Sequence, residues 1–191
     1  MNVSQNSRLR TQQGLTLVEL LVVVTIFVAM TSIALPNLQG FLMTNRITTT
    51  ATALQANFNL ARAISLDKGR IVICKSDNAE APAPVCSTAP NTSSNTGWAA
   101  GWIMFQDINR NGVFDAGDVL VQIQGSLLTA ATQGSLIPTP DTQALQWEAG
   151  GIIGAAPTFQ VAAPSGYTSY TRYVCLTSGA RAMISKSTLC N

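Results

Sequence analysis

Five oxygen-bearing side chains recur at regular intervals between positions 107 and 118. They fall at positions 1, 3, 5, 9 and 12 of a twelve-residue segment and are Asp107, Asn109, Asn111, Asp115 and Asp118, with Gly112 at position 6. Oxygen ligands at these positions, with a glycine at the sharp turn, are typical of EF-hand calcium loops. Position 12 is aspartate instead of the longer glutamate, and strands instead of helices are expected on both sides. The segment therefore predicts either a calcium site or a turn that its own Asp and Asn side chains cap.

Enzymatic chemistry finds no support in the residue types. The sequence contains no histidine and its four cysteines form no CxxC pair, so the usual general base and the usual zinc ligands are missing. No catalytic signature surrounds any serine. We predict that the protein is not an enzyme and that, calcium apart, it requires no cofactor.

The cysteines are better explained as disulfides of an oxidising compartment. An even number of cysteines supports two bridges, although four cysteines allow three connectivities. We favour the local pairing, because each bridge then closes a short, loop-rich stretch. This pairing joins Cys74 to Cys86 and Cys175 to Cys190.

Glu19 is the one acidic residue in an apolar run over 15–35, which follows a short basic segment ending at Gly14. The run has roughly 20 residues and would measure about 30 Å as a helix, enough to cross a bilayer. A carboxylate costs about 2.5–3.5 kcal/mol at the centre of a membrane helix, and such residues are functional by default. We therefore predict a single transmembrane helix over 15–35, in which Glu19 serves assembly.

Two cleavage sites remain open around this helix. Small residues at the −3 and −1 positions would allow a conventional signal peptidase to cut after Ala34. The junction Gly-Leu-Thr-Leu-Val-Glu over 14–19 closely resembles the class III prepilin signal of type IV pilins and type II secretion pseudopilins. That resemblance implies cleavage after Gly14, methylation of Leu15, and pairing of Glu19 with the amine of a neighbouring subunit. We favour it, because a discarded signal gains nothing from a buried carboxylate.

The charge balance argues against a general nucleic-acid binder. Eleven Lys plus Arg face nine Asp plus Glu, and removal of Arg8 and Arg10 with the leader leaves nine of each. A neutral mature chain lacks the broad basic footprint of such proteins. The two arginines flank the membrane span on the side expected to stay cytoplasmic, which leaves the body in the periplasm.

The organisation predicted beyond the span is one helix followed by strands. Apolar residues from Ile47 to Ser65 recur at alternating four- and three-residue steps, which predicts an amphipathic helix within 36–66, interrupted by Pro36 and Gly40. Residues 67–191 form a β-rich globular domain with strands at 70–74, 102–106, 119–124, 143–147, 158–162, 170–177 and 181–185. Residues 76–96 are expected to be loop, with 178–179 as a hairpin turn. We expect the tryptophans at 98, 102 and 147 in the core. This order indicates an α+β roll.

The segment Phe-Gln-Asp-Ile-Asn-Arg-Asn-Gly over 105–112 resembles the Phe-x-Asp-x-Asn-x-Asn-Gly segment of the GspH/FimT family of minor pilins and pseudopilins. With the prepilin signal, the resemblance covers most of the chain and is closest to FimU-like members. It implies a pilin-like roll: one long N-terminal helix, with a transmembrane half and an amphipathic half, packed on an antiparallel sheet. Partners would be other major and minor pilins, the prepilin peptidase and the inner-membrane assembly platform. The protein would be held in the inner membrane with a periplasmic domain, and later in a pilus fibre.

The function implied is that of a minor pilin in a type IV pilus, at its tip or in an assembly-initiating complex, supporting twitching, adhesion or DNA uptake. A type II secretion pseudopilin shares every N-terminal feature, and a periplasmic domain without an assembly role is a further alternative. Some family members bind DNA through Gly-Arg-x-Arg, where 179–182 here reads Gly-Ala-Arg-Ala. Arg181 is thus the candidate DNA contact, with Arg172 and Lys186 as possible neighbours. So few cations would bind DNA weakly.

Overall fold

The structure is a computed structural model that describes residues 16–154, 156–177 and 179–188, with only the backbone described at 33–37. The chain divides into two compact units, Met1–Gln39 and Gly40–Asn191. The boundary between them falls inside one helix, α1 (Leu17–Lys68). Each unit is described by itself below.

The helix α1 covers nearly the range that the sequence predicts, but the expected interruption at Pro36 and Gly40 does not occur. Its backbone continues without a break through Pro36 and Gly40 and ends at Lys68, followed by Gly69 with a φ of 85°. Glycine reaches this left-handed conformation without strain and commonly closes helices in this way. A Cβ atom on Gly40 would lie 2.8 Å from the Tyr170 hydroxyl oxygen. In the second unit Gly40 therefore allows a close approach between α1 and the loop that carries Tyr170.

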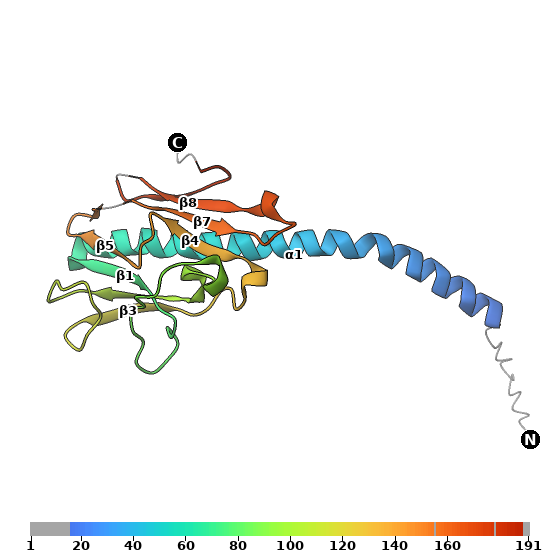
Figure 1. Cartoon of the computed structure of the whole chain (residues 1–191), viewed down its shortest axis with the longest axis horizontal. Coiled ribbons are helices and arrows are strands. Elements are labelled where there is room, and N and C mark those ends of the chain that lie inside the picture. Colours follow the sequence, from blue (N-terminus) through green and yellow to red (C-terminus); the bar gives the residue numbers. More distant parts are fainter. Residues whose placement is uncertain (1–15, 155, 178, 189–191) are drawn as a thin grey trace, which may run out of the picture. The chain divides into compact units, whose positions relative to one another are not determined.

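Among the described residues of the second unit, nine strands form two antiparallel sheets. Figure 1 shows several of these strands alongside α1. The five-stranded sheet has the order β3-β2-β1-β5-β6, and the four-stranded sheet has the order β4-β7-β8-β9. Their bounds are β1 (Ile71–Lys75), β2 (Trp102–Gln106), β3 (Val119–Gln124), β4 (Ser135–Thr139), β5 (Ala144–Glu148), β6 (Ile152–Ile153), β7 (Thr158–Ala162), β8 (Arg172–Leu176) and β9 (Ala182–Ser185). Short 3-10 helices are η1 (Ser93–Asn95), η2 (Trp98–Ala100), η3 (Ala131–Gln133) and η4 (Thr168–Tyr170).

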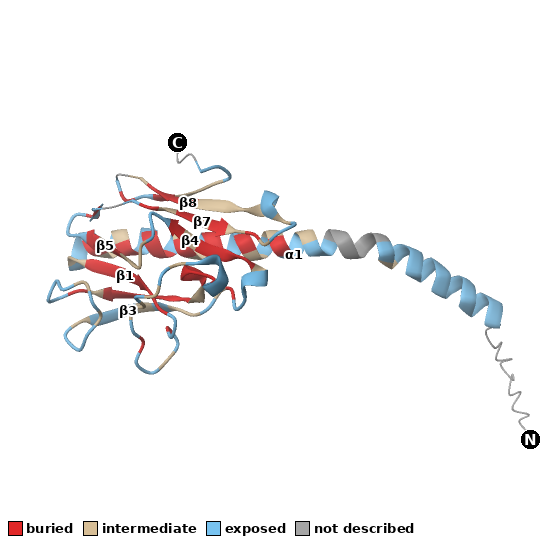
Figure 2. Cartoon of the chain, viewed as in Figure 1, coloured by how far each residue is buried: buried red, intermediate tan, exposed pale blue. Residues whose placement is uncertain are grey.

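The core of the second unit lies between α1 and both sheets (Figure 2). Phe58 on α1 contacts Trp147 on β5 at 5.5 Å and Phe159 on β7 at 5.2 Å between ring centroids. Trp98 meets Phe159 edge to face at 5.1 Å and donates its indole N–H to the Thr142 carbonyl at 2.7 Å. Phe58 thus joins the helix to one strand of each sheet. The α+β class is confirmed, and so is the burial of all three tryptophans.

The strands form two sheets where one was expected, and sequence analysis missed one edge strand of each sheet, β4 and β6. β4 contains Pro138, which cannot donate a ladder hydrogen bond and is tolerated on edge strands. Among the described strands β4 is indeed an edge strand whose neighbour is β7, and its Leu136 also forms an isolated parallel bridge with Gly97. β6 has two residues, too few for a period-2 pattern to be recognised. Strands β2, β3 and β7 match their predicted ranges.

A second, smaller hydrophobic cluster covers the other face of the five-stranded sheet. Its buried members are Val72, Cys74, Ala79, Ile103 and Phe105, with Cys86 and Phe114 packed against them. Ala79 and Cys86 belong to the segment expected to be loop, and most of that segment carries no regular structure. A long loop at 76–96 therefore serves as a covering layer for the sheet.

Candidate functional sites

The segment 107–118 connects β2 to β3 and is organised around Asp107. The Asp107 side chain is buried, and its two oxygens accept hydrogen bonds from the backbone N–H groups of Asn111 at 3.2 Å and Gly112 at 2.9 Å. Gly112 has a φ of 76°, a conformation that L-residues with side chains rarely adopt. The glycine is thus required by the backbone path of the turn.

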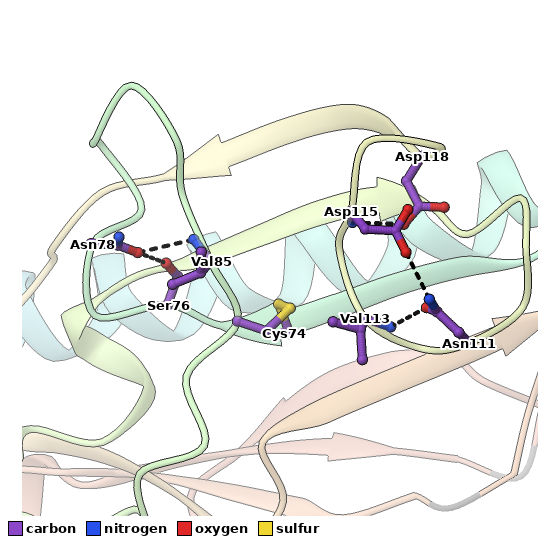
Figure 3. Close-up of a disulfide and its surroundings, with 9 residues drawn as sticks. Cys74, Ser76, Asn78, Val85, Asn111, Val113, Asp115 and Asp118 are labelled. Carbon is purple, nitrogen blue, oxygen red and sulfur yellow. Dashed lines mark hydrogen bonds between the residues drawn. A yellow bond between two sulfur atoms is a disulfide. The ribbon is translucent and has the colours of Figure 1, made fainter.

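The other oxygen side chains of the segment also accept bonds from its own backbone. Asn111 Oδ1 accepts from the Val113 N–H at 2.7 Å, as Figure 3 shows. The Asp118 oxygens accept from the N–H groups of Ile108 at 3.0 Å and Asp115 at 3.1 Å. Each acceptor stabilises one reversal of the chain, as Asx turns do.

Asp115 gathers donors from three other residues of the segment. Its Oδ1 accepts from the Gly117 N–H at 2.9 Å, and its Oδ2 accepts from the side-chain amides of Asn109 at 2.9 Å and Asn111 at 2.7 Å. These bonds lower the pKa of Asp115 below its ordinary value, with the Gly117 N–H as the largest cause and the two amides next. Hydrogen bonds donated to a carboxylate favour its charged form.

This network favours the self-capped turn over the calcium site. Among the described residues, no group of three or more His, Cys, Asp or Glu side chains is arranged to hold a metal ion. A calcium loop turns several side-chain oxygens toward one point, whereas here Asn109 and Asn111 present their amide nitrogens to Asp115. The donor set therefore does not fit the ion as it stands. No step of the function proposed below uses calcium.

Arg70 fastens the base of this segment to the sheet, a role that sequence analysis missed. Its guanidinium lies 3.5 Å from Asp107 and 3.1 Å from Glu148, and it donates to the Arg110 carbonyl at 2.9 Å and to the Gln146 side chain. Arg70 directly precedes β1, and the partners come from elsewhere in the chain. No local sequence signal marks such an arrangement.

The disulfide between Cys74 and Cys86 is confirmed, with a sequence separation of 12 (Figure 3). The loop that it closes is further ordered by Asn78, whose Oδ1 accepts from the Ser76 hydroxyl and the Val85 N–H, both at 3.0 Å. Cys175 on β8 is buried and disulfide-bonded. Its expected partner Cys190 lies outside the described residues.

Only part of the predicted cleavage and membrane-spanning segment lies within the described residues. Gly14 and Leu15 lie outside them, as do the side chains of 33–35, which belong to the expected span. Glu19 is exposed in the first turn of α1, where its backbone N–H donates to Thr16 Oγ1 at 3.2 Å. Within the described residues, no helix combines the length and the apolar character needed to cross a membrane.

Arg181 is exposed just before β9, at the end of the β8-β9 pair where Leu176 meets Ala182. The structure does not bring it together with Arg172 or Lys186, because the register pairs Tyr173 with Ser185 at the other end. Arg172 donates to the backbone carbonyls of Tyr170 at 3.1 Å and Thr171 at 2.9 Å. The antiparallel strands thus place Arg172 and Lys186, the possible neighbours of Arg181, away from it. Binding of DNA by Arg181 stays a prediction.

Comparison with known families assigns the chain. The family described as Type II transport protein GspH matches residues 50–180, well over half of the chain. The chain belongs to the GspH family. The prokaryotic N-terminal methylation motif matches residues 9–35 of this GspH-family protein, the region that contains Gly14, Leu15 and Glu19.

A solved structure shares the fold of this GspH-family chain. That structure is the crystal structure of the type IV minor pilin FimU of Pseudomonas aeruginosa, to which this chain is similar with a TM-score of 0.52 and 16% sequence identity. The match covers 74% of this chain and 89% of the other. Comparison with curated proteins gave no match. The pilin-like roll expected from the sequence is thereby confirmed.

Proposed function

We propose that the protein is a minor pilin of a type IV pilus, placed at the tip or in the complex that initiates assembly. The observation that carries the proposal is the methylation motif at 9–35 on a chain whose globular unit shares the FimU fold. The protein is an assembly component without catalytic activity. Its partners are major and minor pilins, the prepilin peptidase and the inner-membrane assembly platform.

Processing is the first step of this function. The peptidase cuts after Gly14, Leu15 becomes the methylated N-terminus, and the apolar segment 15–35 stays in the mature protein as a single-pass span of the inner membrane. Support comes from the motif match and from the exposed apolar side chains of α1 between Leu17 and Met30. Such side chains need lipid or neighbouring helices around them. The globular unit then lies in the periplasm until the subunit enters the fibre.

Glu19 directs the assembly step. Apolar helices bundle as subunits leave the bilayer, and the ionised carboxylate pairs with the free amine of a neighbouring subunit. In surroundings of low dielectric constant this attraction is much stronger than in water. Glu19 also lies in the first turn of α1, where a negative charge complements the helix dipole.

Mass spectrometry of the mature N-terminus and a Glu19→Ala variant test the proposal together. The mature chain should begin with methylated Leu15. Glu19→Ala should insert normally into the membrane, but its amount in sheared filaments should fall about tenfold, because a loss of about 1.4 kcal/mol of pairing free energy lowers an equilibrium constant tenfold. Thr25→Ala, in the same helix, should enter filaments normally. A mature chain that begins after Ala34, or normal incorporation of Glu19→Ala, would contradict the proposal.

The family description favours a second candidate, a pseudopilin of a type II secretion system, because the matching family is that of a type II transport protein. Deletion of the gene distinguishes the two. Loss of surface pili with normal release of secreted proteins supports the minor pilin. Loss of protein secretion with normal piliation supports the pseudopilin.

A further inference from the structure

A cavity of about 410 Å³ opens between the last turns of α1 and the segment that leads into β9. Its lining combines two arginines with polar and apolar residues from both elements: Asn59, Arg62, Ala63, Leu66, Arg181 and Ala182. All six residues belong to the second unit. The cavity is separate from the 107–118 segment and from the disulfide.

The two guanidinium groups of this cavity lack an ion-pair partner among the residues that the structure describes. No carboxylate contributes to the lining, and across the described part of the chain neither Arg62 nor Arg181 forms an ion pair. Arg62 Nε is buried and lacks any hydrogen-bond acceptor among the described residues. A buried donor without an acceptor is costly and unusual in a native protein. The cavity therefore lacks an acceptor that a ligand could supply.

The surroundings of Arg62 hold it in place. Gly151, in the turn between β5 and β6, lies so close that a Cβ atom there would be 3.2 Å from Arg62 Cγ and 3.6 Å from Arg62 Nε. The β9 side of the cavity is tied to α1, because the Ala182 N–H donates to Asn59 Oδ1 at 3.2 Å and its carbonyl accepts from Gln55 at 3.1 Å. A site with fixed walls loses less entropy when it binds.

We propose that this cavity binds a carboxylate side chain from an acidic segment of a neighbouring pilin subunit, held between Arg62 and Arg181. The identity of the partner rests on the function proposed above. Guanidinium groups suit carboxylates because their N–H donors match both carboxylate oxygens. Ala63 and Leu66 are exposed apolar residues beside the charges, which suits the aliphatic stem of an acidic residue. Two cations on a neutral mature chain are too few for firm contact with nucleic-acid phosphates.

The site itself is tested with the purified full-length protein in a non-ionic detergent and a fluorescent oligoglutamate peptide. Arg62→Gln and Arg181→Gln should each weaken oligoglutamate binding about tenfold or more, since charge-assisted bonds are lost. The matched controls are Arg46→Gln, a half-buried arginine of α1 outside the cavity, and Lys186→Gln, an exposed cation beyond β9. Both should bind as the unaltered protein does. Equal thermal unfolding of all four variants verifies that they fold.

Three results of this measurement would overturn the site. Two of them are a failure of the unaltered protein to bind oligoglutamate and equal losses in the controls. The third is single-stranded oligothymidylate binding that depends on both arginines while oligoglutamate binding does not, which would make the cavity a phosphate site.

The partner is tested in cells by placing a photo-cross-linking amino acid at Ala63, which is exposed at the cavity. The expected product joins this chain to another pilin and disappears in the Arg62→Gln/Arg181→Gln double variant. A cross-link to a pilin that persists in the double variant would show that Arg62 and Arg181 do not hold the partner, and a cross-link to a protein other than a pilin would exclude a pilin as the occupant. If the unaltered protein binds oligoglutamate yet never enters filaments, the proposed function and the pilin partner are both wrong, and the carboxylate site stands.

Discussion

At the scale of single residues, the 107–118 segment is held in its turn conformation by side-chain oxygens that accept hydrogen bonds from its backbone N–H groups. Asp107 is the innermost of them, since it is buried, capped by two backbone N–H groups and close to Arg70. Removing one member of such a group leaves the others without partners in a poorly solvated place. The segment should therefore be sensitive to substitutions that look conservative.

Acidification should loosen this segment through Asp115. Its folded-state pKa is lowered, so its contribution to stability is present above the unfolded pKa and is lost as pH falls through the folded value. Below the ordinary pKa of 3.8, the melting temperature of the unaltered protein should thus fall more steeply than that of Asp115→Asn. Asp67→Asn, at the exposed end of α1, is the control and should follow the unaltered protein. Parallel curves for Asp115→Asn and the unaltered protein would refute the role of the charge.

Calcium removal distinguishes the two readings of the same segment. Because its oxygens already accept hydrogen bonds from the segment itself, we expect EDTA and millimolar calcium to leave the melting temperature unchanged. A ligand that binds only the folded state would raise the melting temperature. At a concentration a hundredfold above its dissociation constant, it would add about 2.7 kcal/mol to the free energy of unfolding. A calcium-dependent rise that Asp118→Asn abolishes would restore the calcium site.

At the scale of elements, the second half of α1 is the common support of both sheets. Phe58 is fully buried and touches one aromatic ring from each sheet. Phe58→Ala should cost about 3–5 kcal/mol of unfolding free energy through lost burial and a residual cavity. Leu60→Ala, on the exposed side of the same helix, should cost only about 0.5 kcal/mol. Chemical denaturation measures both, and similar costs would argue against the observed packing.

The covering loop depends on its disulfide. Replacing Cys74 and Cys86 together by alanine should lower stability by about 2–4 kcal/mol, because the unfolded chain regains the freedom that the bridge removes. Limited proteolysis should then cut within 76–86, where the bridged protein resists. If the double variant resists protease as well as the unaltered protein, the outer cluster and not the bridge holds the loop.

At the scale of the whole molecule, the buried core resides in the second unit. Every core residue whose burial the structure describes lies at position 43 or beyond, so a chain beginning at Gly40 should fold by itself, as compact domains do. Its melting temperature should lie within a few degrees of that of the full chain, and Phe58→Ala should lower both alike. Circular dichroism measures this, and an unfolded fragment would show that the division is wrong.

Features that depend on residues close together in the sequence could be predicted, whereas contacts between residues far apart in the sequence could not. Strands β2, β3 and β7 were predictable because apolar and β-branched residues mark them locally. Pro138 concealed β4, since proline is tolerated in a strand only when neighbouring strands leave its nitrogen unpaired. Arg70 with Asp107, and Arg62 with Arg181, come together only through tertiary packing. The prepilin junction could be recognised since its information is contained in a few consecutive residues.

The burial of Cys74 sets an order of events during maturation. Its sulfur lies beneath the covering loop on a strand with no solvent exposure, so an oxidising enzyme can reach it only before that loop closes. Bond formation must therefore take place on a partly open chain under oxidising conditions. After reduction the freed Cys74 thiol would in turn stay covered until the loop opens, so the rate at which it reacts with a thiol reagent would report the rate of opening.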